Sequence, residues 1–325
     1  MRVLLTGAGG FLGRATVRAL VEQGHSVRAL LRPAAGSQPI PTSAGVEIRW
    51  GDLRSANLDD LLADVDAVVH LAAAFTGDVM EQFQKTVLPT EALLRAMARV
   101  GTRCLVLVST LSVYDWSAPA RELTEDSPLE RRLERRDAYT VSKTWQERLC
   151  RRYAQTHGWR LCVVRPGFIW GNERASLDGV GVRAGSSLIV NGPLRRLPLV
   201  HVESCAECIA LCVASEAAHG QTFNAIDSDD TRAWRYAGEL IRRGQSDARR
   251  RIPLPYHLGL GVAIAVRALA RALFGPDVQL PGILIPERYR ARFRALRFPN
   301  QKAIALLGWK PRVHAESARR DPRRA

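Results

Sequence analysis

Short apolar runs alternate with amphipathic stretches through the first two thirds of the chain. The runs, each four or five residues long, lie at 3–6, 27–31, 46–50, 67–71, 104–108 and 161–164. Buried parallel strands have this composition because helices cover both faces of their sheet. Helical spacing of apolar positions predicts helices near 12–23, 55–63, 79–100, 138–157 and 202–214, and a further strand near 222–226. Strand–helix alternation of this kind predicts an α/β fold with a doubly wound parallel sheet.

A glycine-rich loop directly follows the first run. Residues 3–13 read Val-Leu-Leu-Thr-Gly-Ala-Gly-Gly-Phe-Leu-Gly. In a nucleotide-binding loop, Gly7 would permit the tight turn, Gly10 the close approach of backbone to a pyrophosphate, and Gly13 the packing of helix on sheet. The helix that begins around Phe11 and Leu12 would offer free N–H groups and a positive dipole to the anion. The loop therefore predicts a Rossmann domain that binds a dinucleotide.

The domain organisation follows from a change of pattern after Gly171. Residues 172–200 are rich in glycine and arginine, and 227–325 mix helices with proline-rich turns. We expect residues 1–171 to form the NAD(P)-binding Rossmann domain, with 201–226 returning to it. We expect a smaller, mixed substrate-binding lobe from 172–200 and 227–325.

The region after the second strand indicates which nicotinamide dinucleotide is bound. An acidic residue there binds the ribose hydroxyls of NAD, whereas an arginine suits the 2′-phosphate of NADP. Arg32 stands at the strand end, and no acidic residue follows through Ser43. NADP is therefore favoured, with NAD as the alternative. After the third strand come Asp52 and Leu53, and Asp52 could accept a hydrogen bond from the adenine amine.

A tyrosine and a lysine four residues apart form the candidate catalytic couple. Tyr139 and Lys143 would share one face of a helix, and a nearby ammonium lowers the pKa of a phenol. Such a phenol can exchange a proton with a substrate hydroxyl or carbonyl near neutral pH. Thr110 follows the fifth strand, where the ligand crevice of an open α/β sheet lies, and can hydrogen-bond the same substrate oxygen.

At this point the sequence resembles the extended short-chain dehydrogenase/reductase family, also called NAD-dependent epimerase/dehydratase. The matching motifs run in the family's order and cover most of the chain. They are Thr6 to Gly13, Gly51-Asp52-Leu53, Val69-His70-Leu71-Ala72-Ala73, Val108-Ser109-Thr110 with Val113-Tyr114, Glu125 to Pro128, Tyr139 to Lys143, Arg165-Pro166-Gly167 with Gly171, His201-Val202-Glu203, and Leu307-Gly308-Trp309.

The resemblance implies a role for several of these residues. It makes Tyr139 the acid/base, places Lys143 on the cofactor ribose, and has Thr110 polarise the substrate oxygen. By the same resemblance, the cofactor would be lined by Ala72 and Ala73, and its nicotinamide end by Pro166 and Gly167.

The chain also departs from the family pattern, which narrows the reaction. Thr86 stands where the family often has asparagine, and Leu111-Ser112 replaces the Asp-Glu pair of sugar dehydratases. Without those carboxylates, sugar dehydration is disfavoured. We favour an oxidoreductase that moves hydride between nicotinamide and a secondary alcohol or ketone. A nucleotide-sugar epimerase with tightly bound NAD is the first alternative, and a non-catalytic dinucleotide-binding sensor or scaffold is the second.

Composition and charge limit the choice of partners. The net charge is +15, and only four of the 47 basic residues are lysines. Because no nucleic-acid-binding motif accompanies this charge, we expect a small-molecule substrate and no nucleic acid, and a homodimer stays open. Glu130, Glu134 and the arginines between 131 and 136 alternate as on a solvated helix face.

The cysteines and the terminal segment favour a cytoplasmic protein. Most of the six cysteines lie in apolar segments, for which reduced thiols are the simpler interpretation, and the strand at residues 2–6 leaves no room for a cleaved signal peptide. We expect Cys205, Cys208 and Cys212 to pack in the core rather than bind metal. Residues 258–274 are apolar but contain two arginines, so we expect no transmembrane span. Whether this helix touches a membrane surface or only covers the substrate is left open.

Overall fold

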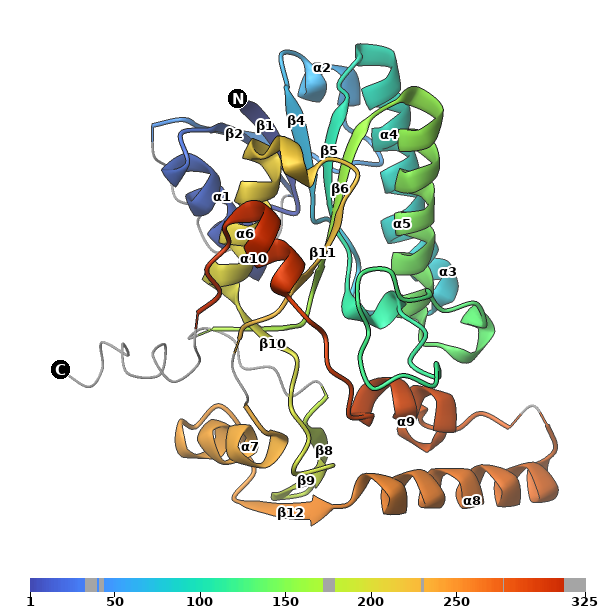
Figure 1. Cartoon of the computed structure of the whole chain (residues 1–325). Coiled ribbons are helices and arrows are strands. Elements are labelled where there is room, and N and C mark those ends of the chain that lie inside the picture. The colour runs from blue at the N-terminus through green and yellow to red at the C-terminus, as the bar shows by residue number, and fades with distance from the viewer. Residues whose placement is uncertain (33–39, 41–43, 172–178, 229–230, 277, 313–325) are drawn as a thin grey trace.

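The computed structural model describes residues 1–32, 40, 44–171, 179–228, 231–276 and 278–312. Its centre is a seven-stranded, entirely parallel sheet in the order β11-β6-β5-β4-β1-β2-β3 (Figure 1). The strands are β1 (Arg2–Thr6), β2 (Ser26–Leu31), β3 (Val46–Trp50), β4 (Ala67–His70), β5 (Cys104–Val108), β6 (Arg160–Pro166) and β11 (Thr222–Ala225). The predicted doubly wound parallel sheet is confirmed.

Helices cover both faces of this sheet, which is why its central strands β1, β4 and β5 are almost entirely apolar. One face carries α1 (Phe11–Glu22), α6 (Val202–Ala214) and α10 (Gln301–Leu307), and the other carries α2 (Leu58–Leu62), α4 (Leu88–Val100) and α5 (Ala138–His157). Side chains alternate along each strand. In β1, Val3 and Leu5 therefore pack with α1 and α6, whereas Leu4 packs in the core under α2, α4 and α5.

The segment predicted as one helix over 79–100 is interrupted in the structure. It comprises α3 (Val79–Gln82), a π-helical turn (Phe83–Val87) and α4. Pro89 lies at the start of α4 and has no N–H to donate to the carbonyl four residues earlier. A π-turn accommodates that missing hydrogen bond without ending the helical path.

The remaining elements form a smaller lobe at one end of the main sheet. Its strands are β7 (Phe168–Trp170), β8 (Gly181–Ala184), β9 (Ser187–Asn191), β10 (Leu199–His201) and β12 (Arg250–Leu254), and its helices are α7 (Ala233–Arg242), α8 (Tyr256–Phe274) and α9 (Pro286–Phe293). β9 pairs antiparallel with β8 and parallel with β12. Within the described residues, α8 has the length and composition of a helix able to cross a membrane.

Parts of the chain beyond residue 200 pack on the main sheet. β11 is hydrogen-bonded to β6, and α6 packs beside α1. The last described segment also joins this core, because Trp309 is buried and its Nε1 donates to the carbonyl of Ser204 at 2.9 Å. Of the predicted lobe, residues 172–178, 229–230, 277 and 313–325 lie outside the described residues.

The cysteines pack as expected from their apolar surroundings. Cys205, Cys208 and Cys212 of α6 are fully buried in the core against α1 and the sheet. Burial raises the pKa of the Cys205 and Cys212 thiols well above the usual range. All three therefore behave as small core side chains at neutral pH.

Candidate active site

The glycine-rich loop connects β1 to α1 at the carboxyl edge of the sheet. Gly7 has φ +76°, and a Cβ there would lie 2.9 Å from the backbone nitrogen of Ala72. A Cβ on Gly13 would lie 2.2 Å from the Gly7 carbonyl oxygen, so only glycine lets α1 pack this closely. α1 begins at Phe11 with Gly10 as N-cap, and no side chain caps it. Its first N–H groups are therefore available to an anion, and the loop fits a pyrophosphate.

The other predicted cofactor residues come from neighbouring strand ends. Because the parallel strands run in the same direction, the ends of β1, β4, β5 and β6 lie side by side at one edge. This edge brings together Gly7, Ala72, Ala73, Thr110, Pro166 and Gly167. A Cβ on Gly167 would come within 2.1 Å of the Pro198 carbonyl oxygen, so the chain after β6 is held tightly there.

The residues predicted to select the dinucleotide lie beyond β2 and β3. Arg32 is exposed directly after β2, and residues 33–39 and 41–43 lie outside the described residues. Arg54 donates two hydrogen bonds to the Asp52 carboxylate, at 2.9 and 3.0 Å. These bonds, with a smaller contribution from the Arg32 charge, lower the pKa of Asp52. The Leu53 side chain is buried in the core beneath α2 and α4.

The first turns of α5 carry the predicted catalytic couple. Asp137 caps the helix by accepting a hydrogen bond from the Thr140 N–H at 2.9 Å. Tyr139 is partly exposed, and its ring stacks on Phe75 with centroids 5.4 Å apart and planes at 19°. The sequence reasoning missed Phe75, which is 68% exposed and follows the alanines after β4. An aromatic residue next to a cofactor-lining motif is the signal that could have found it.

Lys143 lies one turn below Tyr139 and is buried. Its Nζ donates to the Val108 carbonyl oxygen at 2.7 Å and to Oε1 of Gln146. Burial lowers the pKa of Lys143 to about 8. The ammonium thus ties α5 to the end of β5, two residues before Thr110.

Gln146 connects Lys143 to a buried polar network. Its Nε2 donates to Thr90 Oγ1 at 2.8 Å and to the Ala72 carbonyl oxygen at 3.2 Å. His70, at the end of β4, hydrogen-bonds Thr6 Oγ1 through Nδ1 at 2.7 Å and Thr90 Oγ1 through Nε2 at 2.8 Å. Burial, with a smaller effect of the Lys143 charge, lowers the pKa of His70 to about 3. A neutral imidazole therefore joins β1, β4 and α4 beneath the site, with Gln146 Nε2 of α5 3.1 Å from its Nε2.

A buried ion pair anchors the next turn of α5. Arg165 Nη2 lies 2.5 Å from Glu147 Oε1, and Ser109 Oγ donates to Oε2 at 2.7 Å. Burial opposes the charge on Glu147, but the charge and hydrogen bonds of Arg165 outweigh it and hold the pKa at about 2. The Ser109 hydroxyl, next to Thr110, is therefore engaged by Glu147 and has a structural role.

The charged segment at 130–136 is solvated at 131, 132, 134 and 135, as expected, but it does not form an α-helix. It contains only a 3₁₀ turn at Leu133–Arg135. Arg136 is buried, 3.1 Å from Glu130, and donates to the Ser112 carbonyl oxygen at 2.9 Å. The alternation of charges in the sequence does not show which arginine will be buried and donate to backbone carbonyl groups. Arg136 thereby stabilises the turn that follows Thr110. In this turn the Thr110 hydroxyl accepts hydrogen bonds from the N–H and the hydroxyl of Ser112.

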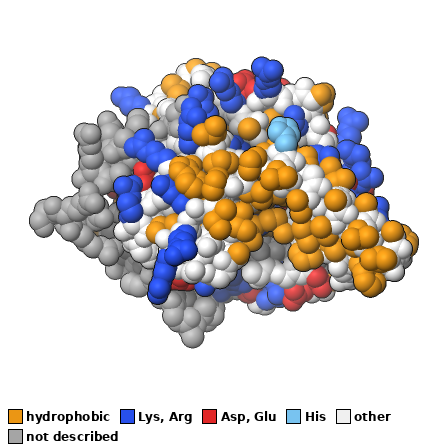
Figure 2. All heavy atoms as spheres, turned by 90° about the horizontal axis from the view of Figure 1, so that it is seen from below, with side chains coloured by type: hydrophobic (Ala, Val, Ile, Leu, Met, Phe, Trp, Pro, Cys, Tyr) orange, Lys and Arg blue, Asp and Glu red, His pale blue; other side chains and the backbone are white. Residues whose placement is uncertain are grey.

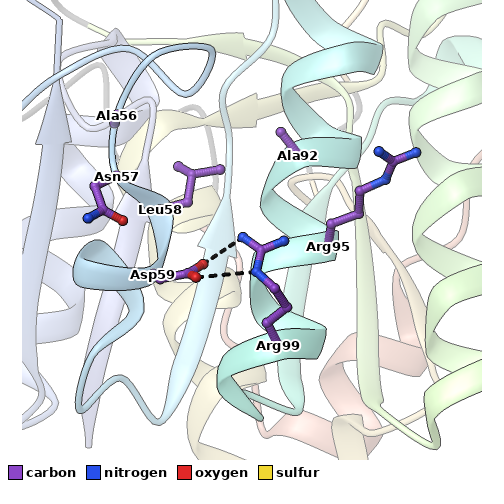
Figure 3. Close-up of a pocket in the computed structure, with 7 residues that line it drawn as sticks. All are labelled: Ala56, Asn57, Leu58, Asp59, Ala92, Arg95 and Arg99. Carbon is purple, nitrogen blue, oxygen red and sulfur yellow. Dashed lines mark hydrogen bonds and ion pairs between the residues drawn. The ribbon is translucent and has the colours of Figure 1, made fainter.

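Two surface hollows are lined by residues other than Tyr139 and Lys143. The one in Figure 3 lies between α2 and α4 and is lined by Ala56, Asn57, Leu58, Asp59, Ala92, Arg95 and Arg99. Asp59 and Arg99 pair there at 2.7 Å. Because α4 runs back from the carboxyl edge, Arg99 lies towards the amino ends of the strands. The second hollow, of about 510 Å³, is lined by residues 121–122, 194–196 and 295–297. In it, Arg195 is buried and donates to the Gly179 carbonyl.

The sheet order and the glycine loop together define a Rossmann-type dinucleotide-binding protein. The chain belongs to the NAD dependent epimerase/dehydratase family, whose model matches residues 3–225. This is the extended short-chain dehydrogenase/reductase class that the motifs indicated, and the relatives found are reductases, dehydrogenases, epimerases and dehydratases.

Individual relatives share about half of their length with this chain. A farnesylated dihydroquinoline-oxide ketoreductase of Stigmatella aurantiaca is 33% identical over 53% of this chain and 52% of its own. A 3β-hydroxysteroid dehydrogenase/Δ5→4-isomerase of Mycobacterium tuberculosis is 32% identical over 53% and 48%. UDP-glucose 4-epimerase of Azospirillum brasilense is 29% identical over 58% and 55%.

Solved structures match the fold over nearly the whole chain. A dTDP-glucose 4,6-dehydratase from Streptomyces venezuelae with bound NAD has a TM-score of 0.73 at 23% identity, covering 99% of this chain and 96% of its own. A UDP-glucuronic acid 4-epimerase from Bacillus cereus with NAD has a TM-score of 0.71 at 17% identity, covering 98% and 95%. At these identities the likeness shows the fold alone.

Proposed function

We propose that this chain is an NAD(P)-dependent oxidoreductase that transfers hydride between nicotinamide and the carbinol carbon of a secondary alcohol or ketone. The observation that carries the proposal is the link between α5 and β5. Lys143, one turn from Tyr139, donates to Val108, and Thr110 follows two residues later. In this proposal residues 1–171 and 201–226 hold the cofactor, and the smaller lobe encloses a small-molecule substrate, whereas α10 and Trp309 support the main sheet.

Each residue has a distinct part in this reaction. When bound, the nicotinamide supplies or accepts the hydride. Tyr139 moves the proton at the substrate oxygen, and Thr110 donates a hydrogen bond to the same oxygen. The Lys143 ammonium provides positive charge beneath the phenol and towards the ribose. Phe75, stacked on Tyr139, limits the orientations of the phenol ring.

The catalytic assignment is tested by Tyr139→Phe. We expect dinucleotide binding to persist while turnover falls by about 10²–10⁴-fold, because the general acid/base is removed. Tyr153→Phe is the matched control, since Tyr153 lies on the same helix and packs near His157 and Trp159. Its turnover should stay at the wild-type level. Full activity in Tyr139→Phe would remove Tyr139 from the mechanism.

For the cofactor we propose a preference for NADP over NAD. Asp52 is already paired with Arg54, so the charge of Arg32 is only partly offset and can meet a 2′-phosphate. Such a charge-assisted contact contributes about 1.5–3 kcal/mol. Arg32→Asp should abolish the NADP preference in calorimetric titrations, whereas Arg18→Asp on the exposed side of α1 should keep it. An unchanged preference in Arg32→Asp would show that another group reads the phosphate.

The alternative reaction is epimerisation of a nucleotide sugar with tightly bound NAD. The UDP-glucose 4-epimerase relative favours it, and epimerisation needs the same Tyr139, Lys143 and Thr110. Net reduction is favoured by the ketoreductase and hydroxysteroid dehydrogenase relatives. The purified protein can be denatured and any released cofactor identified by mass spectrometry. Stoichiometric NAD would support the epimerase, and reversible NADPH binding with carbonyl-dependent oxidation would support the reductase. Dinucleotide binding without either epimerisation or net reduction would support the non-catalytic sensor or scaffold.

A further inference from the structure

Helix α8 presents its large apolar side chains to solvent. Figure 2 shows hydrophobic side chains gathered on the face of the molecule below the lobe, where Figure 1 places α8. The side chains that we call the α8 face are between 47% and 74% exposed: Leu258, Val262, Ile264, Leu269, Leu273 and Phe274. Contiguous apolar surface of this kind marks an interaction site in a folded protein.

The buried positions of α8 are all small residues, and Tyr256 at its start also contacts Tyr289 of α9, with ring centroids 5.8 Å apart. Gly259, Ala263 and Ala270 are its buried positions. A Cβ at Gly259 would lie 2.0 Å from the hydroxyl of Tyr289 in α9, so only glycine allows this approach. The larger residues are exposed because the helix packs with its glycine and alanine positions against the lobe.

Arginine predominates around the α8 face. Residues 248–276 contain five arginines and no aspartate or glutamate, although Asp247 and Asp277 stand just outside this stretch and Glu287 of α9 lies beside it. Arg249, Arg250 and Arg271 are exposed, whereas Arg267 pairs with Glu287 of α9. A second copy of this chain, docked symmetrically through the same face, would bring arginines against arginines. Anionic lipid headgroups instead complement them.

Both ends of α8 are fixed to the same lobe, so the helix cannot cross a bilayer without dismantling that lobe. β12, directly before α8, is hydrogen-bonded to β9. After α8 the chain returns through α9, whose Tyr289 hydroxyl donates to Asn191 Oδ1 at 2.8 Å. A helix held in this way, apolar outward and flanked by arginines, matches one that lies in the plane of a membrane interface.

We propose that the α8 face docks the protein on the surface of a membrane that contains anionic lipids. Leu269, Leu273 and Phe274 enter the boundary between headgroups and acyl chains, and Arg249, Arg250 and Arg271 contact the anionic headgroups. This docking is independent of the reaction proposed above, and its test requires no turnover.

The test is co-sedimentation of the full chain with sucrose-loaded vesicles of phosphatidylcholine, with and without a quarter of phosphatidylglycerol. We expect binding to the anionic vesicles that weakens with salt. Replacing Leu269, Leu273 and Phe274 by serine should reduce the partition coefficient by more than about tenfold. The matched control replaces Val100, Ile304 and Leu306 by serine. These residues lie outside α8 and are 39–43% exposed, and the control should bind vesicles like the wild type. Arg249, Arg250 and Arg271 changed to glutamine should also lower binding by about tenfold or more.

A labelled variant reports the contact directly. The six native thiols are buried, so Leu273→Cys can be labelled selectively with a polarity-sensitive dye. Anionic vesicles should shift its emission to the blue, and leave the emission of labelled Val100→Cys unchanged. The proposal is overturned if the wild type does not bind anionic vesicles, or if the serine variant binds equally well. It is also overturned if light scattering shows a dimer that the serine variant dissolves, without vesicle binding, because a second copy would then cover the face.

Discussion

Helices α5 and α8 have nearly the same length, 20 and 19 residues, and opposite relations to solvent. α5 buries polar side chains, namely Thr140, Ser142, Lys143, Thr144, Gln146 and Glu147. α8 buries one glycine and two alanines and exposes its leucines. In these two helices, the residues that are buried are those with a partner in the fold, even where their polarity would favour exposure.

The cause of the difference lies in what each helix packs against. The polar groups of α5 meet backbone carbonyls and side chains at the ends of β4, β5 and β6, so their desolvation is compensated. α8 contacts α9 through its small buried residues, through Tyr256 and through the Arg267–Glu287 pair, which leaves most of its large apolar side chains outward. Burying polar residues in α5 and exposing apolar residues in α8 both lower stability relative to a helix with its apolar face buried. We therefore associate α5 with the proposed reaction and α8 with the proposed docking.

The largest effect should come from breaking the buried pair on α5. Glu147→Gln leaves Arg165 charged at 2% side-chain exposure, and should lower the free energy of unfolding by about 3–5 kcal/mol. Glu81→Gln is the control, because Glu81 and Lys85 are both about half exposed, and should cost less than about 1 kcal/mol. Urea titrations measure both values. A loss below about 1 kcal/mol for Glu147→Gln would mean that water reaches Arg165.

Gln146 should prove to be a positioning residue for Lys143. Gln146→Leu removes one acceptor of the ammonium, and should lower kcat/KM by about 10–100-fold, as expected for a lost hydrogen bond to a charged group. Gln146→Glu places a carboxylate beside Nζ, which favours the ammonium and raises the pKa of Lys143 from about 8. The alkaline limb of the kcat/KM profile should therefore move to higher pH in Gln146→Glu and to lower pH in Gln146→Leu. Reduced activity with no movement of this limb would leave Gln146 with a purely structural role.

Acid should destabilise the protein through His70. Its folded pKa of about 3 lies below the unfolded value of 6.5, so the unfolded state binds more protons between these limits. Stability is complete above pH 6.5 and is lost as the pH falls towards 3, with about 2 kcal/mol gone by pH 5. His70→Asn should lose about that much less between pH 7.5 and 5 in urea titrations. Parallel losses in the two proteins would place the acid-sensitive group elsewhere.

The same contrast explains which elements the sequence could predict. Strands β1 to β6 lie within about two residues of the runs predicted for them, and in β1, β2, β4, β5 and β6 the signal is strong because both faces of these strands are covered. Strands β8, β9 and β12 were not predicted. β8 is short and partly exposed, and β12 contains Arg250, Arg251 and Pro253, so neither continuous apolarity nor alternation marks them. β9 contains only three consecutive apolar residues, at 188–190, between glycine-containing turns.

The candidate site divides in a similar way. The positions of Gly7, Thr110 and Tyr139 follow from local spacing and from the strand ends beside them. Gln146, and the stacking of Phe75 on Tyr139, could not be found in this way, although the place of Phe75 beside the cofactor-lining alanines is visible in the sequence. Both residues meet their partners across intervals such as the 76 residues between His70 and Gln146, and only the folded sheet brings such residues together.

The smallest effect is expected on α8, and it completes the comparison. Leu273→Gln should change the free energy of unfolding by no more than about 0.5 kcal/mol, because the leucine is 65% exposed and leaves no cavity. Leu93→Gln, in the buried core under α4, is the contrasting substitution and should cost several times more, since it buries an amide among apolar side chains. Urea titrations of both variants, without lipid, give the two numbers. A loss above about 1 kcal/mol for Leu273→Gln would show that the α8 face stabilises the fold in water, and would weaken the argument that its leucines serve an outside partner.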